Sequence, residues 1–460
     1  METSKINEQS FEDLIEKALV GSTREERGKY ADVDDQHPGE DQFYWGLPKD
    51  MDNKLAIDTR RLWSFLEATQ ADVLAKYKGG DIRVDLPTRI KNKINQFGVL
   101  EVLRHPVDLL NINVDLFYPK PSASDSKEAH WQYSQNQFSV TRQLTFSERR
   151  PGLEIDMAIF VNGIPLFTIE LKNPWTYQTA KYDGEMQYRK DRDPRETLLN
   201  FGRCLAHFTM DKDEVYFTTK LEKEKTYFMP FNKGLPDGQG AGNPVNPNGY
   251  KTSYMWEHIF QKDTISDIIS NYSLFDYGKP KKDAYGRTKQ VPHTLKNAKR
   301  LIFPRFHQLD VVTKLVEDVE ENGVGKTYLI EHSAGSGKSN SLTWLAYKLI
   351  DVCPKAMTAR RAKALDEKLF DTIIVVTDRR LLDNQISVNI KAFNKSPKVV
   401  KHAGTSKELK NAIEDNKRIV ITTIQKFPYI CDAISDVSDH NFAIIIDEAH
   451  AHKVVLLLTR

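Results

Sequence analysis

The stretch LEIDMAIFVNGIPLFTIELK, residues 153–172, decides the fold of the first half of the chain. Asn162-Gly163 lies between two apolar runs, which is a strong local signal for a β-hairpin. Burying the same alternating face of both strands requires a loop of odd length or an equivalent bulge. Pro165 favours a bulge because it cannot donate a hydrogen bond to a ladder. The face to be buried comprises Ile155, Met157, Ile159 and Val161 with Pro165, Phe167, Ile169 and Leu171.

This register has a chemical consequence on the opposite face of the hairpin. A three-residue loop centred on Gly163 places Asp156 directly across from Glu170, with Lys172 beside them. A strict two-residue turn would instead send the two carboxylates to opposite faces. Two carboxylates bind a hard cation such as Mg²⁺ through oxygen, and a lysine stabilises the transition state or positions water. The pattern therefore predicts metal-assisted phosphodiester cleavage, whereas a surface salt bridge to Lys172, worth under ~1 kcal/mol, is the alternative.

Asp156, Glu170 and Lys172 have a spacing that resembles the signature of the PD-(D/E)xK nucleases. Gln187 follows at a helical position and is similar to the glutamine that accompanies this signature in restriction motor subunits. The family pattern has a tyrosine four residues after the glutamine, where this chain has Asp191, so a role for Tyr188 stays open.

A further acidic ligand could come from an amphipathic helix expected over Ser10–Leu19. Glu12 and Glu16 are the candidates on it. Solvated helix surface is the expectation for either glutamate taken singly.

The second half of the chain changes pattern at Phe303. Short apolar strands alternate there with helical segments, which predicts a parallel sheet with crossover helices. The expected strands carry the sequences TYLIEH (327–332), TIIVVT (372–377), RIVITT (418–423) and FAIIID (442–447).

A glycine-rich turn follows the first of these strands. Gly335 and Gly337 permit backbone conformations that point N–H groups at phosphate, and Ser336 lies between them. Lys338 supplies a charge for the β- and γ-phosphates, and Ser339 a hydroxyl for Mg²⁺. The strict phosphate-loop pattern begins with glycine where this chain has His332, so residues 334–339 are instead similar to motif I of superfamily-2 helicases. The triplet Gly325-Lys326-Thr327 precedes the strand and is discounted.

The last of these strands ends in Asp447-Glu448-Ala449-His450. Asp447 is the expected Mg²⁺ ligand and Glu448 the residue that polarises the attacking water, with His450 in the same nucleotide site. Upstream, Gln308 in FPRFHQ resembles the adenine-reading residue of the Q motif. Residues 375–385 and 421–427 resemble DNA-contacting motifs of a first motor lobe. ATP and Mg²⁺ are therefore the expected cofactors.

Taken together, these motifs resemble the restriction (motor) subunit of type I restriction-modification enzymes over nearly the full chain. A nuclease ahead of a superfamily-2 motor is the type I order, whereas type III subunits carry the nuclease after the motor. GNPVNPNGYKTSYMWE (242–257) and PRFHQLDVV (304–312) also look like this family. The resemblance implies ATP-driven translocation on double-stranded DNA and its cleavage, in an assembly with methylation and specificity subunits.

The expected fold is α/β, with a PD-(D/E)xK nuclease-like mixed sheet and helices over residues 1–260 and a RecA-like parallel-sheet lobe, the first lobe of a superfamily-2 helicase, over 301–460. The interval 261–300 is expected to be a linker whose basic end is either solvated or DNA-facing; a solvated linker is favoured because charge runs usually are that. The basic residues are Lys279, Lys281, Lys282, Arg287, Lys289, Lys296, Lys299 and Arg300.

Composition restricts the class of protein. Hydrophobic residues make up 40% and the formal net charge is +2, so any DNA contact must come from local patches. Three scattered cysteines argue against a zinc site or a disulfide framework. The polar N-terminus is not a signal peptide, and the apolar run 454–458 is far shorter than the ~20 residues that span a bilayer. A soluble, cytoplasmic protein without a membrane partner is expected.

Only ten residues follow His450, too few for the second lobe that such motors need. The expectation is a truncated or frame-shifted product that binds ATP but neither hydrolyses it well nor translocates. One rival hypothesis is a DEAD/H-type helicase or remodeller with a non-catalytic N-terminal binding module, in which the face of Asp156 and Glu170 is solvated and metal-free. Another is a remnant in which motor and nuclease are both silent.

Overall fold

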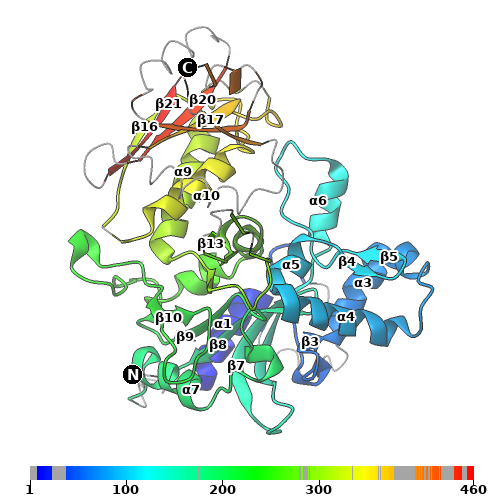
Figure 1. Ribbon diagram of the computed structural model, residues 1–460. Coiled ribbons are helices and arrows are strands. Elements are labelled where there is room, and N and C mark those ends of the chain that lie inside the picture. The colour runs from blue at the N-terminus through cyan, green and yellow to red at the C-terminus, as the bar shows by residue number, and fades with distance from the viewer. Residues whose placement is uncertain are drawn as a thin grey trace. The chain divides into compact units, whose positions relative to one another are not determined.

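The computed structural model shows two compact units (Figure 1). The first comprises residues 1–120 and 128–303, and the second residues 121–127 and 304–460. The described residues are 8–22, 38–173, 177–278, 281–282, 288–289, 291–333, 335–360, 362, 364–377, 399–403, 405, 407–408, 411–412, 415, 417–423, 425, 440–447 and 453–459.

The first unit is built on a mixed seven-stranded sheet with the order β1-β6-β7-β8-β9-β10-β11. Strands β6, β7 and β8 form an antiparallel meander, and β9 pairs parallel with β8. The sheet strands are β1 (Tyr44–Trp45), β6 (Phe138–Thr145), β7 (Glu154–Val161), β8 (Ile164–Leu171), β9 (Ala206–Met210), β10 (Val215–Thr218) and β11 (Met229–Pro230).

The hairpin between β7 and β8 reaches the expected register through a bulge, one of the two routes that the sequence left open. Its turn is the two residues Asn162 and Gly163, with φ values of 50° and 80°, which suit a tight hairpin turn. The register then shifts: Phe160 pairs with Pro165 but Ile159 pairs with Phe167, so Leu166 is the extra residue of a bulge. The bulge restores the pairing that an odd loop would have given.

Helices cover both faces of this sheet. Helix α1 (Glu8–Val20) contacts β6 and β8 and buries Phe11, Ile15 and Leu19. A π-helical turn, η4 (Ala180–Gly184), contacts β8, β9 and β10 and leads into α7 (Glu185–Lys190). Burial on both faces explains why β8 is buried along its whole length rather than alternating.

The remaining elements of the first unit surround the sheet. Asp58 caps α3, because its side chain accepts a hydrogen bond from the Arg61 N–H. The further helical segments are η2 (Pro48–Asp50), α3 (Thr59–Leu74), α4 (Ile82–Phe97), α5 (Val99–Arg104), α6 (Lys127–Ser134), η5 (Thr197–Leu199), η6 (Pro236–Gly238), η7 (Met255–Ile259), α8 (Lys262–Asp267) and η8 (Ile268–Tyr272). The short strand pairs are β2 (Met51–Asp52) with β3 (Ile57–Asp58), β4 (Val107–Leu109) with β5 (Ile112–Val114), β12 (Leu274–Asp276) with β15 (Arg300–Ile302), and β13 (Lys281–Lys282) with β14 (Thr288–Lys289).

The interval 261–300 does not coincide with the boundary between the units, which lies after Phe303. Ile265, Ile268 and Tyr272 of this interval are fully buried. Strand β12 pairs with β15 near the end of the interval, and all of 128–303 belongs to the first unit. The buried apolar face of residues 262–272 therefore belongs to the first unit, although the sequence predicted a linker there.

The second unit contains a six-stranded sheet with the order β16-β21-β20-β17-β19-β18. Helices α9 and α10 contact each other, and α10 contacts β17 and β20. The elements are β16 (Thr327–Glu331), β17 (Thr372–Thr377), β18 (Val400–His402), β19 (Ile419–Thr423), β20 (Phe442–Ile446), β21 (Lys453–Thr459), α9 (Phe306–Asn322) and α10 (Lys338–Leu349).

The expectation of parallel neighbours is correct for the predicted strands β17, β19 and β20, whereas the predicted strand β16 is separated from them by β21, a strand that the sequence did not predict. Strand β21 runs antiparallel to both β20 and β16 and separates them. Only residues 447–452 connect β20 to β21, whereas a parallel return needs a crossover of a dozen or more residues. The short connection therefore forces the antiparallel direction. In the part of the chain that the structure describes, no helix has the length and apolar character to cross a membrane.

Candidate functional site

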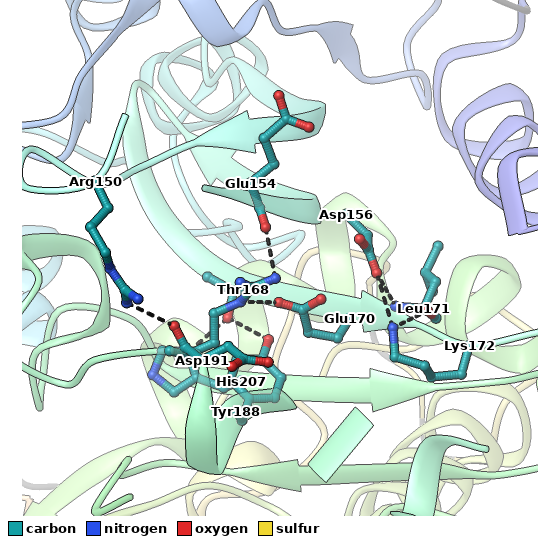
Figure 2. Close-up of polar contacts among 11 residues, drawn as sticks. Arg150, Glu154, Asp156, Thr168, Glu170, Leu171, Lys172, Tyr188, Asp191 and His207 are labelled. Atoms are coloured by element: carbon teal, nitrogen blue, oxygen red, sulfur yellow. Dashed lines mark hydrogen bonds and ion pairs between the residues drawn. The ribbon is translucent and has the colours of Figure 1, made fainter. Parts of the chain in front are cut away.

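Three side chains of the β7–β8 hairpin converge at its open end. Met157 pairs with Ile169, and one step further along the same ladder Asp156 faces Glu170. Asp156 Oδ2 accepts a hydrogen bond from the Leu171 N–H at 2.7 Å and lies 3.7 Å from Lys172 Nζ (Figure 2). The structure thus brings together the three residues that the apolar pattern had placed on one face.

Glu170 is fully buried, so it is no part of a solvated surface salt bridge. Its Oε1 lies 2.6 Å from Arg192 Nε, whereas its Oε2 is buried without a hydrogen-bond partner among the described residues. Burial raises the pKa of Glu170 to about 8, the charge of Asp156 raises it further, and the Arg192 guanidinium opposes the rise. An ionised oxygen left without a donor in a dry site is costly, and a bound cation would satisfy it.

Arg192 is the functional neighbour that sequence reasoning missed. Its side chain is 5% exposed, and besides Glu170 it donates a hydrogen bond to the Glu154 carbonyl at 2.7 Å. In the sequence it is one of several arginines and lysines in and just after α7, and nothing local distinguishes it from a solvated charge. Only the fold shows that it enters the hairpin site.

A buried polar chain adjoins Glu170. Tyr188 Oη lies 2.8 Å from Thr168 Oγ1, which in turn lies 2.7 Å from His207 Nδ1 (Figure 2). Burial lowers the pKa of His207 to about 3 and raises the pKa of Tyr188 well above its usual value. These three hydrogen-bonded side chains are therefore neutral. They support the site structurally and supply no charge to it.

Gln187 lies on α7, one residue before Tyr188, and is half buried. Among the described residues it makes no hydrogen bond to Asp156 or to Glu170. The structure therefore places Gln187 on the helix that flanks the hairpin, without joining it to the carboxylates.

The two candidate glutamates of α1 are buried, contrary to the solvated surface expected of them. Glu12 and Glu16 are 3% and 1% exposed and lie 2.7 and 3.2 Å from Arg142 guanidinium nitrogens. Arg142 pairs with Met157 across the β6–β7 ladder, so it faces away from Asp156. The amphipathic packing of α1, together with the Arg142 counter-charge, explains their burial on the other face of the sheet.

The donor set at the hairpin is small. Within the described ranges, no group of three or more His, Cys, Asp or Glu side chains is arranged to hold a metal ion. The hairpin itself supplies two carboxylates, of which Asp156 is about a fifth exposed and Glu170 has a free oxygen. Two carboxylates suit Mg²⁺ if water or substrate oxygens complete its coordination shell. Mg²⁺ usually retains several waters in proteins.

The glycine-rich turn of the second unit has the conformation that its sequence predicts. Gly335 and Gly337 have φ values of 74° and 86°, and α10 begins at Lys338. Gln308 Nε2 donates hydrogen bonds to the carbonyls of Ser336 and Gly337, at 3.2 and 3.0 Å. The positive φ at Gly337 favours glycine, and a Cβ atom there would lie 2.5 Å from that same Nε2 and displace it. The buried Gln308 therefore holds the turn through its two backbone carbonyls.

The sheet brings the glycine-rich turn and Asp447 to the same edge. Strands β16 and β20 both run antiparallel to β21, so they point in the same direction. The turn follows β16, and Asp447, which is 3% exposed, follows β20 with its N–H donating to the Val376 carbonyl at 2.9 Å. Ala334, Glu448 and His450 lie outside the described residues, as do most of 375–385 and part of 421–427.

Two family models match the chain. The model described as the N terminus of the type I restriction enzyme R protein matches residues 53–226, and the SWI2/SNF2 ATPase model matches residues 307–455. The first match contains the hairpin site, and the second contains the glycine-rich turn and Asp447.

Curated relatives agree with the first model. The HindI endonuclease subunit of a type I restriction enzyme from Haemophilus influenzae is 25% identical over 341 residues, which cover 70% of this chain and 28% of that protein. The putative MjaVIIIP endonuclease subunit of Methanocaldococcus jannaschii is 22% identical, covering 68% and 29%. The SsaAORF53P endonuclease subunit of Staphylococcus saprophyticus is 22% identical, covering 70% and 29%. The aligned part of the chain thus corresponds to well under a third of these relatives' length.

Proposed function

We propose that this chain, which belongs to the type I restriction enzyme R-subunit family, cleaves double-stranded DNA with a Mg²⁺ ion held by Asp156 and Glu170, and binds ATP at the turn 335–339. The observation that carries the nuclease proposal is the buried, unpartnered Oε2 of Glu170 on the same face as Asp156 and beside Lys172. The mixed sheet with helices on both faces agrees with the nuclease fold that the motif implies.

The hairpin residues divide the chemistry among them. Asp156 and Glu170 would hold the cation, which when bound stabilises charge at phosphorus and lowers the pKa of a bound water. Lys172, 8% exposed, keeps its ammonium beside Asp156 and stabilises the negative charge that develops on the phosphate. Arg192 provides a buried positive charge that opposes the rise in the pKa of Glu170 and fixes its Oε1, and the bound cation would further favour the ionised carboxylate. Gln187, on the flanking helix, would contact the substrate phosphate or its water.

The second unit would bind Mg²⁺-ATP. Backbone N–H groups around Gly335, Ser336 and Gly337 and the N-terminus of α10 receive the phosphates. Lys338 neutralises phosphate charge, and Ser339 and Asp447 hold the cation. Glu448 as the residue that polarises water, and His450 as a nucleotide contact, complete this assignment from the sequence.

Because the relatives are longer subunits of type I restriction enzymes, we extend the proposal to a multi-subunit assembly. We infer that ATP-driven translocation on foreign, unmethylated duplex DNA precedes cleavage, and that methylation and specificity subunits recognise the sequence. The relatives' printed names support an endonuclease subunit of a type I restriction enzyme. The rival hypothesis of a remodeller with a non-catalytic first unit draws on the SWI2/SNF2 match, but it gives no account of the free Glu170 oxygen.

The test is plasmid cleavage by the chain assembled with its cognate methylation and specificity subunits. Asp156→Asn and Lys172→Ala should each slow Mg²⁺-dependent cutting by about 10²-fold or more, since each removes charge that acts at the phosphate. Glu154→Gln is the matched control, because Glu154 is exposed on the same strand and contributes only its carbonyl to Arg192. Unchanged cutting by the Asp156 and Lys172 variants would refute the nuclease site and favour the non-catalytic module.

A further inference from the structure

Four basic side chains lie around the glycine-rich turn of the second unit. They come from three elements: Arg305 and His307 from the start of α9, His332 from the position just after β16, and Lys338 from the start of α10. The rings of His307 and His332 approach edge to face, with their centroids 5.3 Å apart. His307 Nε2 also lies 3.2 Å from the carbonyl oxygen of Ser336, the residue between the two glycines. The two imidazoles therefore form one cluster with the turn.

The charges that act on the two imidazoles are all positive. Burial lowers the pKa of His307; the hydrogen bond with the Ser336 carbonyl opposes this fall, and the charge of Arg305 adds to it. Burial likewise lowers the pKa of His332, and the charges of His307 and Lys338 lower it further. Both rings are therefore mainly uncharged near pH 7.

The acidic side chains of the neighbouring elements are engaged elsewhere. On α9, Asp310 pairs with Lys314 at 2.7 Å, and α10 contains no acidic residue. On β16, Glu331 is exposed and lies opposite Lys453 in the ladder with β21. Asp447, at the same edge of the sheet as the turn, is not among the charges that shift the pKa of either imidazole. No described carboxylate thus neutralises the basic cluster, and an anion from outside the protein would do so.

Two further features of the turn fit an anion. Ser336 is 8% exposed, and its Oγ is buried without a hydrogen-bond partner among the described residues. Helix α10 begins without a side-chain cap and without an acidic residue in its first turn, so no side chain there neutralises the positive end of the helix. A hydroxyl and the N–H groups of a helix N-terminus both bind phosphate oxygens.

We propose that His307 and His332 take up protons when the phosphates of ATP bind at the turn, so that nucleotide binding by the second unit is coupled to pH. The identity of the anion as the phosphates of ATP rests on the proposed function. A negative charge nearby favours the protonated form of an imidazole. Protonation in turn adds to the positive charge that Lys338 presents to the phosphates.

The direction of the pH dependence follows from linkage between the two binding events. Because the pKa of each imidazole is higher in the complex than in the free protein, ATP binds more tightly at lower pH. This gain in affinity is complete below the pKa of the free protein and is lost as the pH rises through the pKa of the complex. The slope of log affinity against pH gives the number of protons taken up.

The experiment measures ATP binding and proton uptake together. The full chain is titrated with Mg²⁺-ATP by isothermal titration calorimetry at pH 7, in PIPES and in imidazole buffer, whose ionisation enthalpies differ. The dependence of the observed heat on the buffer gives the number of protons bound per ATP. The test variant carries His307→Asn and His332→Asn. The matched control is His440→Asn, because His440 precedes β20 at the edge of the sheet opposite to the turn.

We expect the wild type and the control to take up roughly 0.5 to 1 proton per ATP, and to bind ATP about threefold or more tightly at pH 6.5 than at pH 8. The double variant should take up almost no protons, and its affinity should change by less than about twofold over the same range. A second variant, His307→Asn with His332→Arg, carries a fixed positive charge. It should bind ATP at pH 8 at least as tightly as the wild type and without proton uptake, which separates loss of titration from loss of fold.

The outcomes separate this inference from the assignment of the ATP site. Proton uptake that disappears in the double variant and persists in His440→Asn supports the role of the two imidazoles. ATP binding without proton uptake, or with the same uptake in the double variant, overturns that role and leaves the turn as the nucleotide site. No ATP binding by the wild-type chain overturns both.

Discussion

Glu170 accepts a hydrogen bond from Arg192 at 2.6 Å through one carboxylate oxygen and keeps the other oxygen buried without a hydrogen-bond partner among the described residues. The pair is therefore incomplete in hydrogen bonding, and burial raises the pKa of Glu170 to about 8 despite the guanidinium beside it. A buried ion pair adds little stability by itself because both ions lose their hydration, yet removal of one partner is strongly destabilising. A functional role for a charged carboxylate at this position explains the arrangement better than a contribution to folding stability does.

The first prediction concerns this ion pair. Arg192→Leu should destabilise the protein by about 3–5 kcal/mol at pH above 8, where Glu170 would remain charged without a counter-ion. The loss should be smaller at pH 6, because the pKa of Glu170 is already raised to about 8 by burial and the carboxyl can take up a proton. Urea unfolding of wild type and variant at both pH values measures the difference.

Arg195→Leu is the control for the Arg192 variant. Arg195 is mostly exposed and pairs with Asp193 at the surface, so its loss should cost under ~1 kcal/mol at either pH. If the two variants lose the same stability, the Glu170–Arg192 pair is not the buried unit described above.

The second prediction concerns pH and His207. Burial lowers the pKa of His207 to about 3 from 6.5, so the unfolded chain binds a proton there before the folded protein does. The contribution of this group is present above pH 6.5 and is lost as the pH falls from 6.5 toward 3, by up to about 1.4 kcal/mol per pH unit. Urea unfolding of His207→Gln should show a weaker fall in stability over this range than the wild type, and parallel curves would contradict the assignment.

The third prediction compares two lysines near the nucleotide site. Lys338→Ala should weaken ATP binding by about 10²-fold or more, since it removes the charge that meets the phosphates at the start of α10. Lys326→Ala should leave ATP affinity unchanged, because Lys326 precedes β16 and pairs with Asp318 at 2.9 Å. Isothermal titration calorimetry with Mg²⁺-ATP measures both, and equal losses would show that the glycine-rich turn has been misassigned.

The fourth prediction distinguishes two roles for Gln308. Its hydrogen bonds to the Ser336 and Gly337 carbonyls indicate that it supports the turn, whereas the sequence resemblance implies that it reads adenine. Gln308→Ala should therefore weaken ATP and GTP to a similar extent, by about tenfold for two lost hydrogen bonds. A variant that loses preference for ATP while keeping its affinity would restore the adenine-reading role.

The hairpin shows how far the sequence predicts the candidate site. Alternation of apolar residues over 153–172 requires an odd offset between the strands, and that requirement alone brings Asp156 to Glu170. The sequence left open whether an odd-length loop or a bulge produces this offset. The structure has a two-residue turn followed by a bulge at Leu166. Both devices give the same register, so the chemical prediction did not depend on the choice.

Other features had no local signal. Arg192, Glu12 and Glu16 are charged residues on or next to helices, and sequence patterns favour solvent for all three; their burial depends on counter-charges from distant strands. The direction of β21 likewise followed from the length of its connection to β20 and not from its composition.

By itself, the sequence determined the strand register of the hairpin, the phosphate-loop turn and the order of the two units, because alternation, glycine conformation and strand–helix succession act over a few neighbouring residues. Only the tertiary structure decided which charges are buried and with whom, since an ion pair between segments far apart in the chain depends on how helices and strands pack. The free oxygen of Glu170 belongs to this second kind, because it results from a carboxylate on one strand and a guanidinium that follows a helix some twenty residues later.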